Sequence, residues 1–307
     1  MKEAPLVSIA LCTYNGSAHL AGQLDTLVNQ SYPDIEIVAV DDRSTDDTFA
    51  ILQQCAARYP QIKIHQNEVN LGFTANYQKA LSLCKGDLIA LCDQDDIWNL
   101  HKIELQVAAI KDNMLIYHDS EFIHEDGTPM NRKMSDIRSF YRGGNPEPFL
   151  FDNCVSGHAI LMKKQLLDAA LPFNKRFFHD WWLAYVATNL GTIDFLPQCL
   201  VKYRQHDKSE TNILKREREN DPNDLPPIEK YKFRTEWLGY CARFEKNKYP
   251  QLVKKVYEIY KKREEHFVIL SLGWLLLTHP DLLAISIKKG LSKLNVIRKE
   301  MRGIKVK

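Results

Sequence analysis

The stretch Leu88-Ile89-Ala90-Leu91-Cys92-Asp93-Gln94-Asp95-Asp96 decides the fold. Its first five residues form the short apolar run that is typical of a strand buried on both faces. Three carboxylates follow within four positions. An isolated buried carboxylate is costly, and neighbouring carboxylates raise each other's pKa. The stretch therefore predicts a buried strand that ends at an open edge, where a cationic group can face the aspartates.

The same pattern occurs twice upstream. The apolar run Val7 to Cys12 leads into the turn Thr13-Tyr14-Asn15-Gly16, and the run Ile35 to Val40 leads into Asp41-Asp42. A further strand is predicted at 62–64, and helical patterns separate these strands at about 17–29, 44–58, 73–84 and 99–111. This alternation predicts a Rossmann-like α/β fold, with a mostly parallel sheet and helices on both faces. Right-handed connections bring the carboxyl ends of the parallel strands to one edge, where such sheets bind ligands.

The second half has a different pattern. A β-hairpin of strands 114–118 and 121–124 is predicted, with a turn at Asp126-Gly127 nearby. Further strands are expected at 158–162 and 200–204, and helices at 164–170 and 179–190. We expect a domain over 1–206, a polar, proline-ended linker over 207–227 and a C-terminal helical region over 228–307.

Composition limits the class of protein. The 307 residues are 45% hydrophobic and 26% charged with a net charge of +2, so the chain as a whole does not resemble a nucleic-acid binder. Seven scattered cysteines without a CxxC pair suit a reducing compartment. The N-terminus lacks a signal-peptide pattern, and the longest apolar run, Phe267 to Leu277, is too short to span a bilayer. We expect a cytoplasmic protein.

Several ordered motifs resemble the inverting family 2 glycosyltransferases of GT-A fold. They are VSIALCTYNG, SYPDIEIVAVDDRSTDDT, NLGFTANYQKAL, GDLIALCDQDDIW, FHDWW and YRQH, and together they cover about residues 5–206. CDQDDIW with YRQH is most similar to the bacterial rhamnosyltransferase-type subgroup. The resemblance implies transfer of a sugar from dTDP-rhamnose or a UDP-sugar to a glycan or lipid-linked acceptor in bacterial surface polysaccharide synthesis. It implies a single displacement, which inverts the anomeric carbon.

The resemblance also implies a metal and nucleotide site. A nucleotide diphosphate cannot lie against carboxylates unaided, whereas a bridging Mn²⁺ or Mg²⁺ with hard oxygen ligands resolves the conflict. The implied metal ligands are Asp95, Asp96 and His206. The implied contacts with the nucleotide sugar are Thr13, Tyr14, Asn15, Asp41, Asp42, Asn70, Gly72, Asn76, Asp93 and Asp95.

Asp180 matches the position of the family's catalytic base. A positioned carboxylate can take the proton that an acceptor hydroxyl loses as it attacks. The acceptor side is implied at Ser156, Gly157, His158, Trp181 and Trp182. Simple alternatives remain open, since an aspartate at a helix start can be an N-cap and a tryptophan can belong to the core.

Two other functions are alternatives to glycosyl transfer. A sugar nucleotidyltransferase would need a glycine-rich, basic loop after the first strand, and TYNGSAH is neither. A non-catalytic carbohydrate-binding scaffold would not need Asp95, Asp96 and Asp180. The C-terminal region has 13 Lys+Arg against 5 Asp+Glu over 251–307. It is expected either to pack as a helical bundle or homo-oligomer contact, or to touch the inner face of the cell membrane peripherally.

Overall fold

The computed structural model describes residues 4–206, 226–285 and 291–303. The predicted linker 207–227 lies almost wholly outside these described residues. The chain divides into two compact units. The first comprises Met1–Asp136, Arg142–Gly144 and Val155–Arg204, and the second comprises Ile137–Tyr141, Asn145–Cys154 and Gln205–Lys307.

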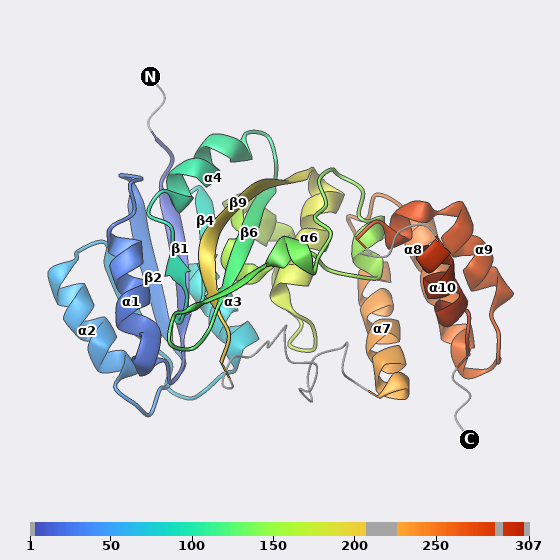
Figure 1. Cartoon of the computed structure of the whole chain (residues 1–307), viewed down its shortest axis with the longest axis horizontal. Helices are drawn as coiled ribbons and strands as arrows, with labels where there is room; N and C mark the ends of the chain where they lie inside the picture. The colour runs from blue at the N-terminus through green and yellow to red at the C-terminus, as the bar shows by residue number, and fades with distance from the viewer. Residues whose placement is uncertain (1–3, 207–225, 286–290, 304–307) are drawn as a thin grey trace. The chain divides into compact units, whose positions relative to one another are not determined.

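The first unit is built on one mixed sheet in the order β3-β2-β1-β4-β8-β6-β9-β5, with β7 paired to β6 (Figure 1). The strands are β1 Val7–Thr13, β2 Ile35–Asp41, β3 Ile62–Gln66, β4 Leu88–Cys92, β5 Ile97–Trp98, β6 Leu115–Ile123, β7 Pro129–Lys133, β8 Leu161–Lys163 and β9 Ile193–Arg204. Strands β3, β2, β1 and β4 are parallel, as predicted. Each residue of β4 is buried, which explains why this strand has no polar face.

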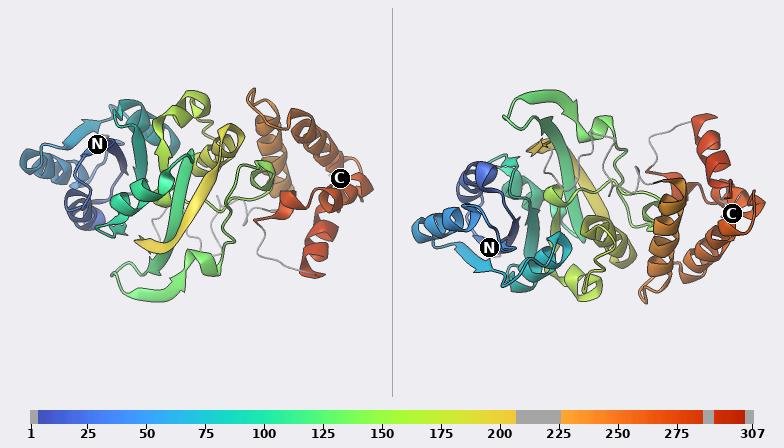
Figure 2. Two further views of the ribbon diagram at one scale, coloured as in Figure 1. Left: turned by 90° about the horizontal axis from the view of Figure 1, so that it is seen from above. Right: turned by 90° about the horizontal axis from the view of Figure 1, so that it is seen from below.

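Helices cover both faces of the parallel half, as predicted (Figure 2). They are α1 Ser17–Val28, α2 Thr48–Arg58 and α3 Phe73–Leu83. The chain moves outward from β1 through β2 to β3 and then returns to β4 beside β1. Because such crossovers are right-handed, α1 and α2 share one face while α3 covers the other, where it packs on β1 and β2. Helices α5 Leu167–Ala170 and α6 His179–Leu190 complete this unit together with α4 Lys102–Ile110.

The predicted hairpin of strands 114–118 and 121–124 is wrong. β6 runs unbroken through this segment, and its hairpin partner is β7, reached through a turn in which Gly127 has a φ of +86°. The two residues between the expected strands, Asp119 and Ser120, are buried and belong to β6. Asp119 accepts bonds from the Ser120 and Ser135 amides and from Ser135 Oγ. The pairing of β6 with β9 shifts register at this point, so a bulge replaces the expected break.

Three other boundaries differ from the predictions. The strand expected from His158 begins at Leu161, because Gly157–Ala159 forms a 3₁₀ turn instead. The strand expected at 200–204 begins at Ile193, since it follows β6 along its whole length. The expected helix at Asn99 starts only at Lys102, after the two-residue strand β5. β5 and β8 are antiparallel to their neighbours, so not every strand ends at the same edge.

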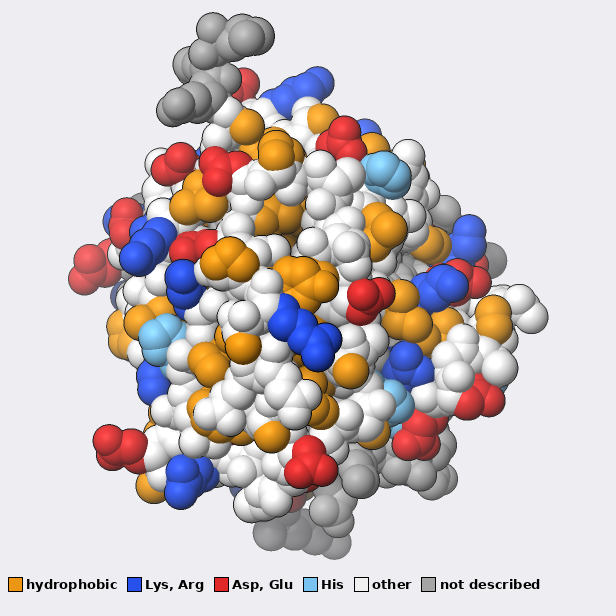
Figure 3. Space-filling view, turned by 90° about the vertical axis from the view of Figure 1, so that its left-hand side faces the viewer, with side chains coloured by type: hydrophobic (Ala, Val, Ile, Leu, Met, Phe, Trp, Pro, Cys, Tyr) orange, Lys and Arg blue, Asp and Glu red, His pale blue; other side chains and the backbone are white. Residues whose placement is uncertain are grey.

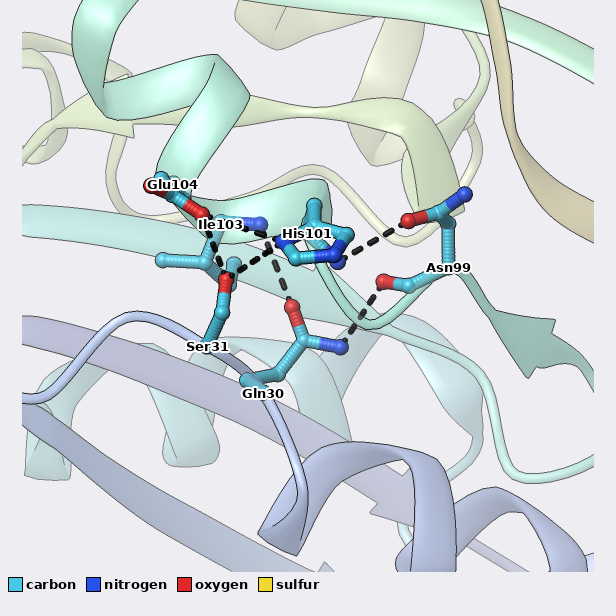
Figure 4. A network of polar contacts seen from close by, with 6 residues as sticks. All are labelled: Gln30, Ser31, Asn99, His101, Ile103 and Glu104. Carbon is cyan, nitrogen blue, oxygen red and sulfur yellow. Dashed lines mark hydrogen bonds and ion pairs between the residues drawn. The ribbon is translucent and has the colours of Figure 1, made fainter.

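The start of α4 is fixed by a polar network (Figure 4). Gln30 donates to the Asn99 carbonyl and accepts from the Ile103 amide, at 2.9 and 3.2 Å. The His101 ring lies 3.0 Å from Ser31 Oγ. These contacts tie the loop after α1 to the segment that follows β5, and so fix the chain that carries the aspartates of the opening stretch.

The second unit is helical, as predicted from Pro227 onward. Its α-helices are α7 Pro227–Ala242, α8 Pro250–Lys261, α9 Leu270–Thr278 and α10 Leu291–Glu300. Trp237 is fully buried and donates to the Phe149 carbonyl at 3.1 Å. Arg263 donates to Tyr260 Oη and pairs with Glu300, at 2.6 and 2.9 Å, which ties α8 to α10.

Two general features concern the whole described chain. The seven cysteines all lie within it, and each is a thiol rather than half of a disulfide. None of the described helices is both long and apolar enough to cross a membrane. On the face turned to the viewer in Figure 3, acidic and basic side chains are interspersed.

Candidate active site

The carboxyl ends of β1, β2 and β4 lie next to one another and carry the polar turns predicted from the sequence. The Asp42 amide donates to the Thr13 carbonyl at 2.8 Å and so continues the ladder past the end of the strands. Gln94 bonds to both backbone groups of Tyr14: its Oε1 accepts from the amide at 2.8 Å and its Nε2 donates to the carbonyl at 3.0 Å. These contacts join the turn after β1 to the acidic turn after β4.

Asp41 is fully buried and links the end of β1, the turn after β2 and the end of β3 through hydrogen bonds. Its carboxylate accepts from Thr13 Oγ1, from the amide and hydroxyl of Ser44, and from Gln66 Nε2. Four hydrogen bonds leave little capacity for a ligand. Thr13 is likewise buried, and its hydroxyl faces Asp41.

Asp42 organises the loop before α3. Its Oδ1 accepts from Asn67 Nδ2 at 2.6 Å and from the Leu71 amide at 2.8 Å, while Oδ2 accepts from the Gly72 amide at 2.8 Å. Asn67 also donates to Asn76, whose own amide group donates to the Val40 carbonyl. The predicted residues Asp42, Gly72 and Asn76 therefore belong to one network.

Gly72 and Asn15 have unusual backbone conformations at this edge. Gly72 has a φ of +82° and a ψ of 156°, a region that side chains other than glycine rarely adopt. Its amide is within 3.0 Å of Asn70 Oδ1 as well as Asp42. Asn15 has a φ of +47°, and its side-chain oxygen accepts from the Thr45 amide at 2.8 Å. Asn15 follows Tyr14, whose side chain is exposed.

The acidic turn after β4 is held by Tyr77 of α3. The Tyr77 hydroxyl lies 2.6 Å from Asp93 Oδ1 and 2.9 Å from the Cys92 carbonyl. Burial, followed by the charge of Asp95, raises the pKa of Asp93 to about 6, while the bond from Tyr77 opposes this rise. Burial and the two neighbouring aspartates also raise the pKa of Asp96 well above its ordinary value.

Asp93, Asp96 and His158 form a group that could hold a metal ion. Each offers one ligand atom, and these atoms lie within 4.8 Å of one another. Asp96 Oδ1 accepts from the Arg204 amide at 3.0 Å, whereas its buried Oδ2 has no hydrogen-bond partner in the part of the chain that the structure describes. The His158 ring places Nε2 2.8 Å from Ser120 Oγ. This residue was predicted on the acceptor side, and it is buried instead beside the acidic turn.

A buried lysine lies under the same turn. Lys102 donates to the His158 carbonyl at 2.8 Å, and its ammonium lies 3.0 Å from the centre of the Trp98 ring. Burial lowers the pKa of this lysine to about 7, and its neighbours Cys92, Asp96 and Asp93 oppose that shift. When Lys102 is protonated, its charge lowers the pKa of Asp93 and Asp96 and so opposes the effect of their burial.

The other two predicted metal ligands have different surroundings. Asp95 is partly exposed, and its backbone carbonyl accepts from Arg204 Nε at 2.7 Å. Arg204 also donates to the Glu125 carbonyl at 2.6 Å, so this arginine braces the acidic turn. His206 belongs to the second compact unit, whereas the aspartates of the acidic turn belong to the first.

The start of α6 lies beside Tyr77. The centre of the His179 ring lies 4.4 Å from that of the Tyr77 ring. Among the described residues, neither of the two buried His179 nitrogens has a hydrogen-bond partner. A Cβ on Gly157 would lie 3.3 Å from His179 Nε2, so the loop of Ser156 and Gly157 also approaches this helix end. Contacts thus run from Asp93 through Tyr77 to the first turn of α6, which carries Asp180.

Asp180 is half-buried, and its Oδ1 accepts from the Trp181 amide at 2.6 Å. This contact fits a carboxylate in the first turn of a helix. Trp181 and Trp182 are both buried, and the indole of Trp182 donates to the Ala170 carbonyl at 2.8 Å. The Trp182 side chain thus lies in the protein interior, as expected for a core tryptophan.

The family is decided by comparison with known sequences. Residues 8–171, more than half of the chain, match the model of the family described as glycosyl transferase family 2. The chain belongs to glycosyl transferase family 2. The matched segment contains nearly all of β1, strands β2 to β4 and the acidic turn, whereas α6 with Asp180 lies beyond it.

Relatives of this family 2 chain agree with the assignment. An uncharacterised glycosyltransferase of Haemophilus influenzae is 26% identical over 97% of the chain and 100% of its own length. The TuaG protein of Bacillus subtilis, named as a teichuronic acid biosynthesis glycosyltransferase, is 32% identical over 65% of the chain and 79% of its own length.

Solved structures support the fold. Residues 1–349 of Staphylococcus aureus TarS, crystallised with UDP-GlcNAc, align with a TM-score of 0.61 and 16% identity, over 96% of this chain and 88% of that one. The mannosyltransferase PcManGT of Pyrobaculum calidifontis, crystallised with GDP-Man and Mn²⁺, aligns with a TM-score of 0.53 and 15% identity, over 97% and 80%. At these identities the alignments establish the GT-A-like fold alone.

Sequence reasoning missed four residues of this family 2 site: Asn67, Tyr77, Gln94 and Lys102. Tyr77 and Lys102 lie on the buried faces of helices, where an aromatic ring or a long side chain gives no local signal of function. Gln94 stands inside the quoted stretch, but its role depends on a partner 80 positions away. Asn67 follows β3 at a strand end, and that position was the one available signal.

Proposed function

We propose that this family 2 transferase is metal-dependent and inverting, and that it moves a sugar from dTDP-rhamnose or a UDP-sugar. One observation carries the proposal: the acidic turn after β4 and the start of α6 are linked through Tyr77. A diphosphate-binding acidic turn and a base must lie close together for a single displacement, because the acceptor oxygen attacks the carbon that the diphosphate leaves.

The acidic turn fits a divalent cation. Hard oxygen ligands suit Mg²⁺ and Mn²⁺, and the buried Asp96 Oδ2 lacks a partner among the described residues. We propose Asp95 and Asp96 as ligands, and Asp96 also lies with Asp93 and His158 in a group whose ligand atoms are within 4.8 Å of one another. His206 stays a candidate from the sequence alone. The cation would supply charge neutralisation for the leaving diphosphate. It would also oppose the raised carboxylate pKa values.

The loops at the ends of β1 and β2 support a nucleotide pocket. Asp42 holds the loop of Asn70 and Gly72 through two backbone amides, and this loop is the predicted cover of the nucleotide. Tyr14 offers an exposed aromatic face at the same edge. We propose that Asp42 and Asn76 set the shape of this pocket, while Asp41, Thr13 and Asn15 hold its walls.

Asp180 is the proposed general base. It would accept the proton of the acceptor hydroxyl as the oxygen–carbon bond forms and the bond to the diphosphate breaks, with inversion at the anomeric carbon. Since one of its oxygens accepts from the Trp181 amide, the carboxylate has a fixed orientation. We propose Ser156 and Gly157 on the acceptor side, because their loop approaches the same helix start.

The acceptor class is proposed from the relatives. TuaG is named for teichuronic acid biosynthesis, and a glycan or lipid-linked acceptor in bacterial surface polysaccharide synthesis would suit a related enzyme. A cytoplasmic site of action follows from this proposal, because nucleotide sugars are its donors.

A donor panel tests the proposal. Purified protein is incubated with UDP-, dTDP- and GDP-sugars, with Mn²⁺ or with chelator, and thermal shift and nucleotide release are recorded. The expected result is a metal-dependent shift with one nucleotide, because a ligand that binds only the folded state raises its apparent stability. Binding that is identical in chelator would overturn metal dependence. Binding of a free sugar without any nucleotide would favour the carbohydrate-binding scaffold, and pyrophosphate release from a nucleoside triphosphate would favour a nucleotidyltransferase.

A further inference from the structure

Helix α9 of the second unit is apolar on two opposite faces. Leu272, Leu275 and Leu276 are buried in the unit. By contrast Leu270, Trp274 and Leu277 are 73%, 69% and 55% exposed. Their spacing places them along one side of the helix. An exposed apolar stripe on a helix whose other face is already buried cannot be explained by packing within this unit.

The stripe continues into the segment before the helix. Phe267 and Val268 are 70% and 55% exposed. We call these two residues, with Leu270, Trp274 and Leu277, the α9 stripe. With about 150–250 Å² for each large side chain, the exposed fractions amount to an apolar surface on the order of 600 Å². That is at the upper end of the largest patch on a typical monomer, and such patches are often functional.

Basic side chains lie next to the α9 stripe. Val268 pairs with Arg302 in an antiparallel bridge, and the Gly303 amide donates to the Phe267 carbonyl at 2.7 Å. The end of α10 is thereby fixed beside the start of α9. Arg298, Lys299 and Arg302 are all exposed there.

Glu300, at the end of α10, does not cancel that charge, whereas Glu265, just before the α9 stripe, is exposed and 3.9 Å from His266. Glu300 is already paired with the buried Arg263 at 2.9 Å. The helix α9 has no charged residue of its own. The surface therefore combines an apolar stripe with a basic border formed by the last turn of α10.

We propose that the α9 stripe and its basic border form a docking surface for an anionic lipid membrane. The apolar side chains, with Trp274 among them, would enter the boundary between headgroups and acyl chains, while the arginines and lysine contact lipid phosphates. The protein would lie on the membrane surface, since none of the described helices can span it. This inference uses only the second unit and does not depend on the donor, metal or base proposed above.

A second copy of the chain is the rival occupant. Two copies meeting through this surface would bring their basic borders together, and like charges oppose such a contact. The apolar area also falls below the roughly 800 Å² per partner of a stable protein interface. Charge and area both favour a lipid surface.

The sequence offers a built-in probe. Of the five tryptophans, Trp98, Trp181, Trp182 and Trp237 are buried, and Trp274 is the exposed one. The full chain is mixed with vesicles of phosphatidylcholine alone or with phosphatidylglycerol, and binding is measured by co-sedimentation. Vesicles with brominated acyl chains then report insertion, because bromine quenches a tryptophan that reaches them. We expect binding to the anionic vesicles, weakening as salt rises, with quenching that disappears in Trp274→Phe while binding persists.

Two variants test the two parts of the surface. The triple change Leu270→Ser, Trp274→Ser and Leu277→Ser should lower binding at least tenfold. Reversal of Arg298 and Lys299 to glutamate should lower it by about fivefold or more for each residue at low ionic strength. The matched control is Leu100→Ser, which removes a 46% exposed leucine from the first unit and should leave binding unchanged.

The results that would contradict membrane docking can be distinguished from one another. Protein that stays in the supernatant with anionic vesicles at low ionic strength overturns the proposal, as does binding that the triple variant retains. Self-association that the triple variant abolishes, without vesicle binding, would assign the surface to a second copy instead. Circular dichroism and an unchanged urea unfolding transition confirm that each variant is folded.

Discussion

Replacing Tyr77 by phenylalanine removes a single buried oxygen at the centre of the site. Tyr77 is 3% exposed, and its hydroxyl lies 2.6 Å from Asp93 Oδ1 and 2.9 Å from the Cys92 carbonyl. A hydrogen bond to a charged group contributes about 1.5–3 kcal/mol, and one between neutral groups about 1 kcal/mol. The size of the loss therefore depends on whether Asp93 is ionised.

The ionisation of Asp93 sets the pH dependence. Burial and the charge of Asp95 raise its pKa to about 6, so at pH 8 it is ionised and at pH 5 it is mostly protonated. A carboxyl group with a raised pKa binds its proton more tightly in the folded protein. Its contribution to stability therefore falls as pH rises from its ordinary value through about 6. Without the Tyr77 bond, which lowers this pKa, the fall extends to higher pH.

We therefore expect Tyr77→Phe to lose about 1.5–3 kcal/mol of unfolding free energy at pH 8 but only about 1 kcal/mol at pH 5. Urea denaturation in chelator measures both values without interference from bound metal. Tyr32→Phe is the matched control, because its hydroxyl donates to the neutral Pro5 carbonyl at 2.7 Å. The control should lose a similar amount at both pH values and keep its transferase activity. An equal loss at pH 5 and pH 8 for Tyr77→Phe would refute the link to Asp93.

Three further changes test the site. Asp180→Asn should reduce turnover by about 10²–10⁴-fold with little change in donor affinity, measured by nucleotide release and titration; lost donor binding with intact turnover would move Asp180 to the donor side. Asp95→Asn should weaken nucleotide binding in Mn²⁺ and leave the weak binding in chelator unchanged, as calorimetry would detect; equal affinity in both conditions would contradict a metal role. Gly72→Ala should destabilise the protein by about 1–3 kcal/mol, because its φ of +82° strains an alanine even though no atom lies within 4 Å of the added carbon. Unchanged unfolding would show that the loop can relax.

Local pattern predicted the parallel half of the fold well. Fully apolar runs such as Leu88 to Cys92 are buried between layers of helices. The helical patterns between such runs predict the crossover connections. The antiparallel half was harder because its strands contain polar residues. The break expected between the strands 114–118 and 121–124 is absent, because Asp119 and Ser120 have hydrogen-bond partners in distant segments and remain within a continuous strand.

By itself, the sequence determined the parallel half of the sheet, its binding edge and the acidic turn at this edge. The spacing of apolar residues and the carboxylates at strand ends are local properties of the sequence. The tertiary structure alone decided what each polar group faces. The carboxylate of Asp41 accepts hydrogen bonds from neighbouring segments, and the Lys102 side chain is buried beneath the aspartates. Tyr77 connects Asp93 with the helix that carries Asp180. The α9 stripe depends on the same distinction: its leucines resemble core residues in the sequence, and only the packing of α9 leaves one face open to solvent. A hydrogen bond or an exposed face depends on segments far apart in the chain, so no window of sequence contains it.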